Sequence, residues 1–287
     1  MATFQSVSTT PPANMSSIVI TKPTGLAAGD LMVAHIAYAN TGGTDTLETL
    51  SGWTLTDELS FGQGRSNVQW KIASAGDAAA SDFTWTGTGQ DWMGGAIFRI
   101  SGTSTTPITR STDTNVVGGG FAFDTSTAPP VEQCLILFLT AGEGNVAAAD
   151  GSAYSWTSSP SITERYDMFA ENTVTSVDDI FMAGATGTQA GTGNIGNASC
   201  TVTNGSSLAA ALHLIAVTPE VGVTVTPDVL SAASSIQDPV ISGGATIEPA
   251  VLSAASAVQE PTVTTPVSTW SNMSKSSAPT WTNTSKS

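Results

Sequence analysis

Residues 31–39 read LMVAHIAYA, a short stretch that is apolar on both faces of an extended chain. Three further stretches share this pattern, at residues 94–100 (GGAIFRI), 134–141 (CLILFLTA) and 208–217 (LAAALHLIAV). Each is bounded by Gly, Asp, Asn or Ser and is short for a helix, which predicts fully buried strands. The last stretch is rich in Ala and Leu, but the following Val-Thr-Pro favours a strand there too.

Working outward from these stretches, several segments alternate in polarity or carry aromatic and β-branched residues, at residues 16–21, 53–59, 67–73, 82–86, 161–168 and 172–181. No long segment keeps a helical period, and only residues 75–80 and 147–150 suggest short helical turns. Many short strands with buried central members indicate two packed antiparallel sheets. The sequence therefore predicts an all-β fold, an antiparallel β-sandwich that is jelly-roll-like, over residues 1–220.

Composition narrows the classes of partner. The chain has 287 residues, 40% of them hydrophobic and only 11% charged, with a formal net charge of −15 and eight Lys and Arg in total. Nucleic acids and anionic membranes attract clustered cations, so neither is an expected partner. The start of the chain has no signal-peptide pattern and no apolar run is long enough to span a bilayer, which predicts synthesis in a cytoplasm. Cys134 and Cys200 are expected to be thiols, with a disulfide as the alternative.

A repeat with a period of eleven residues fills the end of the chain. It follows a boundary at residues 218–222, and its first and third blocks, VTVTPDVLSAA and ATIEPAVLSAA, match over a longer period of 22 residues. Residues 221–266 are rich in Pro, Val, Ser and Ala, so an extended or β-rich segment that spaces or oligomerises is predicted. Residues 267–287 carry two blocks of the form Trp-[Ser/Thr]-Asn-x-Ser-Lys-Ser.

The two tryptophans of these last blocks lie among small polar residues that offer no local core. Large exposed aromatic side chains are unfavourable unless a partner buries them. We therefore expect residues 267–287 to anchor the chain on a neighbouring subunit, with the docking residues Trp270, Asn272, Lys275, Trp281, Asn283 and Lys286.

Catalytic and metal-binding patterns are weak. Both histidines, His35 and His213, lie inside the apolar stretches and are expected to be core residues with satisfied hydrogen bonds. No G-x-S-x-G or H-E-x-x-H motif is present. The acidic pairs are poor glycosidase dyads because neighbouring residues of a strand point to opposite faces; they are Asp57 with Glu58, Glu164 with Asp167, and Asp178 with Asp179. The last pair is also a weak calcium candidate, and no cofactor is expected.

Two glycine-rich segments, residues 118–120 and 184–196, lack the features of a phosphate-binding loop and are expected to be surface loops. Loops of this kind suit contacts with glycans, for which aromatic side chains provide stacking surfaces. The candidates are Trp92, Tyr154, Trp156 and Tyr166, with packing in or beside the core as the alternative for each.

The chain also resembles a β-sandwich domain that recurs in tailed-bacteriophage and some bacterial surface proteins. The matching segments are residues 29–34 (GDLMVA), 52–55 (GWTL), 69–73 (QWKIA), 82–86 (DFTWT) and 95–102 (GAIFRISG). The Trp-Asn-Ser-Lys blocks resemble short C-terminal repeats of phage virion proteins. Together these matches cover about 80 residues of the first domain and the final 20, and the motifs are structural rather than catalytic.

The resemblance implies a non-enzymatic bacteriophage virion protein, in which capsid decoration or a head fibre is favoured. It also implies that the partners are other virion proteins and copies of the same chain, with a trimer favoured, and that the location is the virion. The alternative is a tail-fibre or surface receptor-binding module that binds a glycan.

Overall fold

The computed structural model describes residues 1–39, 46–88, 92–117, 120–123, 132–145, 154–157, 162–170, 180–192, 198–202, 206–220, 223–224 and 245–246. The chain divides into two compact units, Met1–Glu220 and Val221–Ser287. Among the described residues, no helix is long and apolar enough to cross a bilayer.

The first half of the Met1–Glu220 unit contains eight strands and one short helix. The strands are β1 (Thr3–Ala13), β2 (Ser17–Thr21), β3 (Leu31–Ala39), β4 (Thr46–Leu47), β5 (Thr54–Phe61), β6 (Gly64–Ile72), β7 (Asp82–Thr88) and β8 (Trp92–Ser101), and the helix is α1 (Ala75–Ala79). They form a five-stranded sheet in the order β1-β8-β3-β6-β5 and a three-stranded sheet in the order β2-β7-β4. The order of these strands in the two sheets is that of a jelly roll, except that β5 pairs with β6 at the edge of the larger sheet.

The second half repeats this arrangement. Its strands are β9 (Thr103–Val117), β10 (Gly120–Phe123), β11 (Cys134–Asn145), β12 (Tyr154–Thr157), β13 (Ile162–Ala170), β14 (Ile180–Gln189), β15 (Ala198–Val202) and β16 (Ser206–Pro219). The sheet orders are β9-β16-β11-β14-β13 and β10-β15-β12, so each strand takes the place of the strand eight positions earlier. Every pairing within these sheets is antiparallel.

Local irregularities also recur at equivalent positions. In β5 the register with β6 shifts between Leu55 and Asp57, and in β13 the register with β14 shifts between Glu164 and Tyr166. This bulge aligns Thr56 with Arg165. Leu31 on the central strand β3 and Leu135 on the central strand β11 occupy equivalent positions in the two sheets. Two residues before each leucine, the backbone takes a left-handed conformation, at Gly29 and at Gln133. The two halves therefore share backbone detail as well as strand order.

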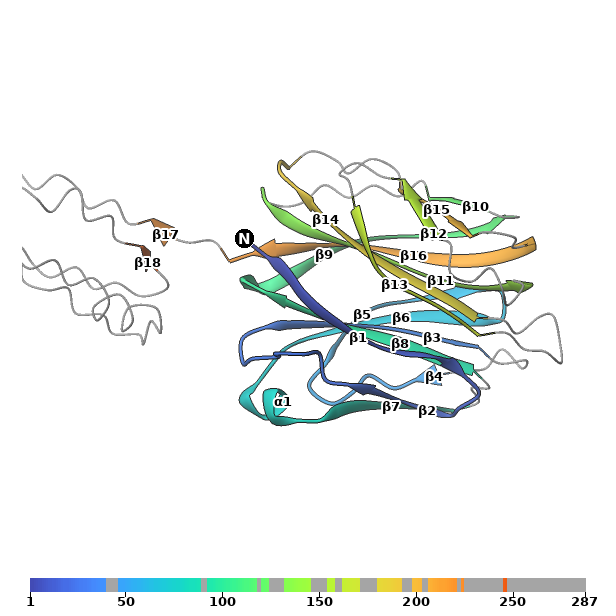
Figure 1. Cartoon of the computed structure of the whole chain (residues 1–287), viewed down its shortest axis with the longest axis horizontal. Coiled ribbons are helices and arrows are strands. Elements are labelled where there is room, and N and C mark those ends of the chain that lie inside the picture. The colour runs from blue at the N-terminus through green and yellow to red at the C-terminus, as the bar shows by residue number, and fades with distance from the viewer. Residues whose placement is uncertain are drawn as a thin grey trace, which may run out of the picture. The chain divides into compact units, whose positions relative to one another are not determined.

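The two large sheets pack face to face, and each is covered on its other face as well. Figure 1 shows this stacking. From bottom to top, the layers contain β2 and β7, then β3 and β8, then β11 and β16, and finally β15. One core cluster lies between the two five-stranded sheets. A second lies between β3, β8 and the sheet of β2 and β7, and a third lies on the outer face of β11, β14 and β16. Alternate residues of β3 belong to different clusters, with Val33 facing the second sheet and Ile36 facing β2 and β7.

This stacking explains the four stretches that are apolar on both faces, because they are the central strands β3, β8, β11 and β16. The predicted all-β antiparallel sandwich is confirmed, including a strand at residues 208–217. The sequence predicted one sandwich over residues 1–220, whereas the structure places two in that range. The packed interface between them adds a buried face that a single sandwich does not have.

Smaller features follow the sequence. The helical turn predicted at residues 75–80 is α1, whose capping box joins Ser74 and Asp77. The turn predicted at residues 147–150 lies outside the described residues. Cys134 is a fully buried thiol at the start of β11, and Cys200 lies on β15 opposite Phe121 and Trp156.

In the Val221–Ser287 unit, β17 (Val223–Thr224) pairs in parallel with β18 (Ala245–Thr246). Val223 is opposite Ala245, which is the equivalent position one 22-residue period later. The pairing therefore joins the first and third repeat blocks at the same point of the repeat.

Candidate functional site

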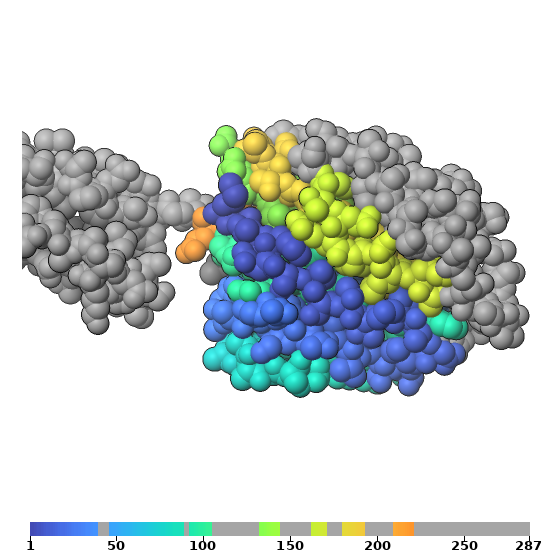
Figure 2. Space-filling view, viewed as in Figure 1, coloured from blue at the N-terminus to red at the C-terminus, as the bar shows by residue number. Residues whose placement is uncertain are grey.

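A pocket of about 460 Å³ opens where the first strand of the chain meets the second large sheet. Figure 2 shows β1 in dark blue lying against β13 in yellow-green at this place. The lining residues come from four segments, namely the start of the chain with β1, and strands β11, β13 and β14; they are Met1, Ala2, Thr3, Phe4, Leu135, Thr163, Arg165, Thr186, Gly187 and Thr188. Residues 163 and 165 line it while Glu164 between them does not, as expected for alternating side chains of a strand.

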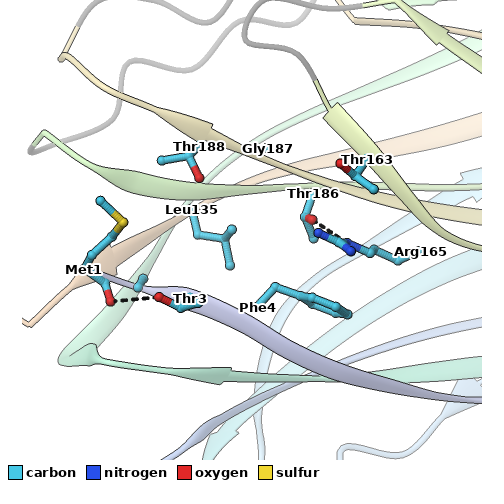
Figure 3. Close-up of a pocket in the computed structure, with 10 residues that line it drawn as sticks. Met1, Thr3, Phe4, Leu135, Thr163, Arg165, Thr186, Gly187 and Thr188 are labelled. Carbon is cyan, nitrogen blue, oxygen red and sulfur yellow. Dashed lines mark hydrogen bonds between the residues drawn. The ribbon is translucent and has the colours of Figure 1, made fainter.

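Arg165 is the only charged side chain among these lining residues. Its Nε donates a hydrogen bond of 2.7 Å to Oγ1 of Thr186, a side chain that is 3% exposed. The guanidinium carbon lies 4.1 Å from the ring centroid of Phe4, whose ring packs edge-on against Phe98 at 6.1 Å. The guanidinium is therefore held by a hydrogen bond along one edge and by a cation–π contact on one face. Figure 3 shows this position between Thr186 and Phe4.

The hydrogen bond to Thr186 comes from Nε, and no hydrogen bond from the two terminal nitrogens of Arg165 is seen among the described residues. Among the described residues, no carboxylate forms an ion pair with Arg165, whereas Arg65, Lys71 and Arg99 each have an acidic partner. Partial burial lowers the pKa of Arg165 below its ordinary value, but an arginine keeps its charge in proteins. A partly buried cation without a carboxylate partner is energetically unfavourable, and an anionic ligand would relieve this.

The rest of the pocket combines hydroxyl groups with an apolar floor. Leu135 is buried, and Figure 3 shows Thr163 above the guanidinium and Thr188 to the left, above Leu135. Oγ1 of Thr3 donates to the carbonyl oxygen of Met1 at 3.3 Å. Threonine hydroxyls both donate and accept hydrogen bonds, so the pocket suits a small ligand with an anionic group and several hydroxyls.

A second polar cluster lies deep between the two large sheets. Nδ1 of His35 is 2.5 Å from the Tyr166 hydroxyl, and Nε2 of His35 is 2.9 Å from Oγ of Ser66. Nε2 of His213 is also 2.9 Å from this oxygen, and the two imidazole rings are 6.0 Å apart. Two assignments satisfy these contacts: Tyr166 donates to His35, His35 to Ser66 and Ser66 to His213, or each hydrogen bond runs in the opposite direction. Both imidazoles are then neutral.

Burial explains the titration of this cluster. His35 is fully buried, and burial lowers its pKa well below the ordinary value, with the nearby His213 as a further cause. Burial also raises the pKa of Tyr166 well above its ordinary value. A serine in contact with two imidazoles resembles a catalytic arrangement, but all the side chains of this cluster are buried and none lines the described pocket. The cluster therefore joins the two sheets and offers no access to a substrate. The prediction that both histidines are hydrogen-bonded core residues is confirmed.

The expected glycan-stacking residues lie on three different strands, β8, β12 and β13. Tyr166 is a correction: its ring is buried against Phe98 and its hydroxyl bonds to His35, so it presents no open face for stacking. Trp92 is partly buried at the start of β8 and packs against the core between the large sheets. Tyr154 and Trp156 lie on β12, and the structure does not describe their side chains.

The expected docking residues of the tail, Trp270, Asn272, Lys275, Trp281, Asn283 and Lys286, lie outside the described residues, as do Asp178 and Asp179. Among the described residues, no group of three or more His, Cys, Asp or Glu is placed to hold a metal ion. Glu164 and Asp167 are neighbours on β13 whose pKa values are raised by burial, and the charge of Asp167 adds to the effect on Glu164.

Sequence reasoning did not identify Arg165. The available signal was its position as the one cation in a strand-like segment, SITERYDM, that also carries two carboxylates. Such a segment looks like a solvated edge strand, and the bulge that turns Arg165 towards Phe4 depends on the pairing of β13 with β14.

Comparisons with known proteins do not identify the chain: no family model, no curated protein and no solved structure matches it.

Proposed function

We propose that this chain is a non-enzymatic structural protein of a bacteriophage virion, serving as a capsid decoration or head fibre. The observation that carries the proposal is the jelly-roll-like strand order, found twice in succession. Jelly rolls are common in viral capsid and lectin domains. The face-to-face packing of two such sandwiches gives a rigid body with an extensive core, which suits a particle component.

The repeat unit supplies the means of assembly in this proposal. Pairing between β17 and β18 follows the 22-residue period, so two similar blocks are brought into parallel register. Repeats that stack in register are typical of elongated, quasi-one-dimensional structures. We assign residues 221–266 to spacing or to assembly with identical copies, and residues 267–287 to anchoring on another virion protein.

The test is immunogold labelling of purified virions with antibodies raised against residues 1–220, alongside analytical ultracentrifugation of the recombinant full chain. We expect labelling of the particle surface and a homo-oligomer. A chain that lacks residues 267–287 should lose incorporation into particles while it keeps a β-rich circular dichroism spectrum. Incorporation of the shortened chain at the level of the full chain would refute the anchoring role.

A second candidate function is receptor binding at a host surface glycan, and the Arg165 pocket favours it. The pocket combines a partly buried guanidinium, threonine hydroxyls and an apolar floor. A glycan array probed with the full chain separates the two functions, since specific binding favours adhesion and silence favours decoration. Incubation with capsular polysaccharide should release no reducing ends, because both candidate functions are non-enzymatic.

A further inference from the structure

Comparison of the two halves shows that positions lining the Arg165 pocket carry different side chains in the first half. The shared bulge and the matching strand registers align Thr163, Thr186 and Thr188 of the second half with Thr54, Trp70 and Ile72 of the first. Trp70 and Ile72 are partly buried and pack against the core between the large sheets. At this place the first half therefore has an indole and a branched aliphatic side chain where the second half has two threonines.

The same alignment places Thr56 where the second half has Arg165. The pocket thus differs from its counterpart in two coordinated ways: large side chains are replaced by small hydroxyl-bearing ones, and a neutral side chain is replaced by a cation. Shorter side chains alone would leave an apolar gap, and the arginine alone would have no space beside it. Together they make a cavity with a fixed charge.

We propose that this pocket binds an acidic saccharide through a carboxylate held by Arg165, an inference that rests on the second candidate function. The planar guanidinium matches a carboxylate in a two-pronged hydrogen-bonded pair, and both terminal nitrogens are without a described partner. Thr163 and Thr188 provide hydroxyls for the ring hydroxyls of the sugar, and Leu135 provides an apolar surface. A volume of about 460 Å³ admits one or two sugar residues.

Charges near the pocket are compatible with this ligand. Glu164 and Asp167 flank Arg165 along β13, but neither lines the pocket and neither forms an ion pair with it in the described structure. The chain as a whole is acidic, with a formal net charge of −15, so long-range repulsion disfavours anions in general. Binding therefore depends on short-range contacts with Arg165 and the hydroxyls, which selects a ligand that offers both.

The experiment measures binding of methyl β-glucuronide to the full chain by isothermal titration calorimetry, with methyl β-glucoside and acetate as matched probes. The glucoside lacks the carboxylate, and acetate lacks the sugar. We expect a Kd of about 1 mM or tighter for the glucuronide and at least about tenfold weaker binding of either comparison probe. Equal affinity for the glucuronide and the glucoside would overturn the role of the carboxylate, and equal affinity for acetate would overturn that of the saccharide.

Three variants locate the binding. Arg165→Gln removes the cation, and we expect about tenfold to hundredfold weaker binding of the glucuronide. Thr188→Ile introduces the residue found at the equivalent position of the first half and keeps Arg165. We expect it to reduce affinity by filling the pocket, so it tests the proposal even if Arg165→Gln does not fold. Arg65→Gln is the control, because Arg65 pairs with Glu58 and does not line the pocket, and it should bind as the unaltered chain does.

Unchanged binding in both pocket variants, or no binding of the glucuronide to the unaltered chain, overturns the proposal. A glycan array separates this failure from failure of the second candidate function. Binding to neutral glycans alone would refute only the proposal of an acidic ligand. Binding to no glycan on the array would refute the receptor-binding function as well. Virion labelling tests the structural function independently of both.

Discussion

Substitution of His35 by asparagine should remove a dependence of stability on pH that the buried cluster builds into the fold. Asparagine does not titrate and still offers one donor and one acceptor between Tyr166 and Ser66. In the folded chain the pKa of His35 is well below 6.5 because of burial and the nearby His213. In the unfolded chain His35 titrates at its ordinary pKa. Between these two values the unfolded state binds more protons than the folded state.

The sign and size of the effect follow from this difference in proton binding. The contribution of His35 to stability is fully present above pH 6.5 and is lost progressively as the pH falls through the unfolded pKa. The loss approaches about 1.4 kcal/mol for each further pH unit, which gives at most about 1.4 kcal/mol at pH 5.5 and at most about 2.7 kcal/mol at pH 4.5. It ends once the pH reaches the folded pKa.

The assay is urea unfolding of the full chain and of His35→Asn, followed by tryptophan fluorescence at about pH 7.5, 6.5, 5.5 and 4.5. Carboxylates titrate in both proteins, so the difference between their free energies of unfolding reports His35 together with its coupling to His213. At pH 7.5 the variant should be less stable by about 1–3 kcal/mol, because asparagine does not reproduce the hydrogen-bond geometry of the imidazole. This deficit should shrink as the pH falls. A deficit that stays constant from pH 7.5 to 4.5 would refute the assignment of a neutral, buried His35.

Three further predictions concern packing, backbone conformation and a partly buried ion pair. Leu137→Ala, in the core between the large sheets, should lower the free energy of unfolding by about 3–5 kcal/mol in urea titrations, and a loss below 1 kcal/mol would argue against this interface. Gln133→Gly should raise stability by up to about 1 kcal/mol in the same assay, because Gln133 has a φ of 61° that glycine adopts without strain; destabilisation would contradict this. Burial raises the pKa of Asp77, but hydrogen bonds from Lys71 and Ser74 outweigh it and leave the pKa below 3.8, so the stability that Asp77 contributes is lost only as the pH falls through this lowered value. Asp77→Asn should therefore destabilise at neutral pH and lose that effect near pH 2, as thermal melts followed by circular dichroism would show.

Much of the fold was predictable because period and composition report burial directly. A strand such as residues 31–39 must be covered on both faces, and the sequence contains four such strands. The same argument did not predict two sandwiches, because burial on both faces does not identify what lies on each side. At residue 33 the neighbour is the other large sheet and at residue 36 it is the sheet of β2 and β7, yet both are apolar.

The candidate site was less predictable, and the reasons are local. Tyr166 was a candidate for glycan stacking with packing in or beside the core as the alternative, and the structure buries its ring and places its hydroxyl on His35. Arg165 was overlooked because of the bulge in β13, since one inserted residue reverses which side chains face inwards. Bulges depend on long-range pairing and have no reliable sequence signature.

The duplicated architecture separates structural features from candidate functional ones. Features present in both halves, such as the bulge and the left-handed residues before Leu31 and Leu135, are required to build the same sandwich twice. Features present in one half need another explanation. His35 aligns with Leu139 and Arg165 aligns with Thr56, so neither the buried cluster nor the charged pocket is needed for the shared strand order. The buried cluster is accounted for by its contacts across the interface between the halves. In the pocket, Arg165 bonds to Thr186 through its Nε and contacts the ring of Phe4, which leaves its two terminal nitrogens as the groups that the proposed ligand would use.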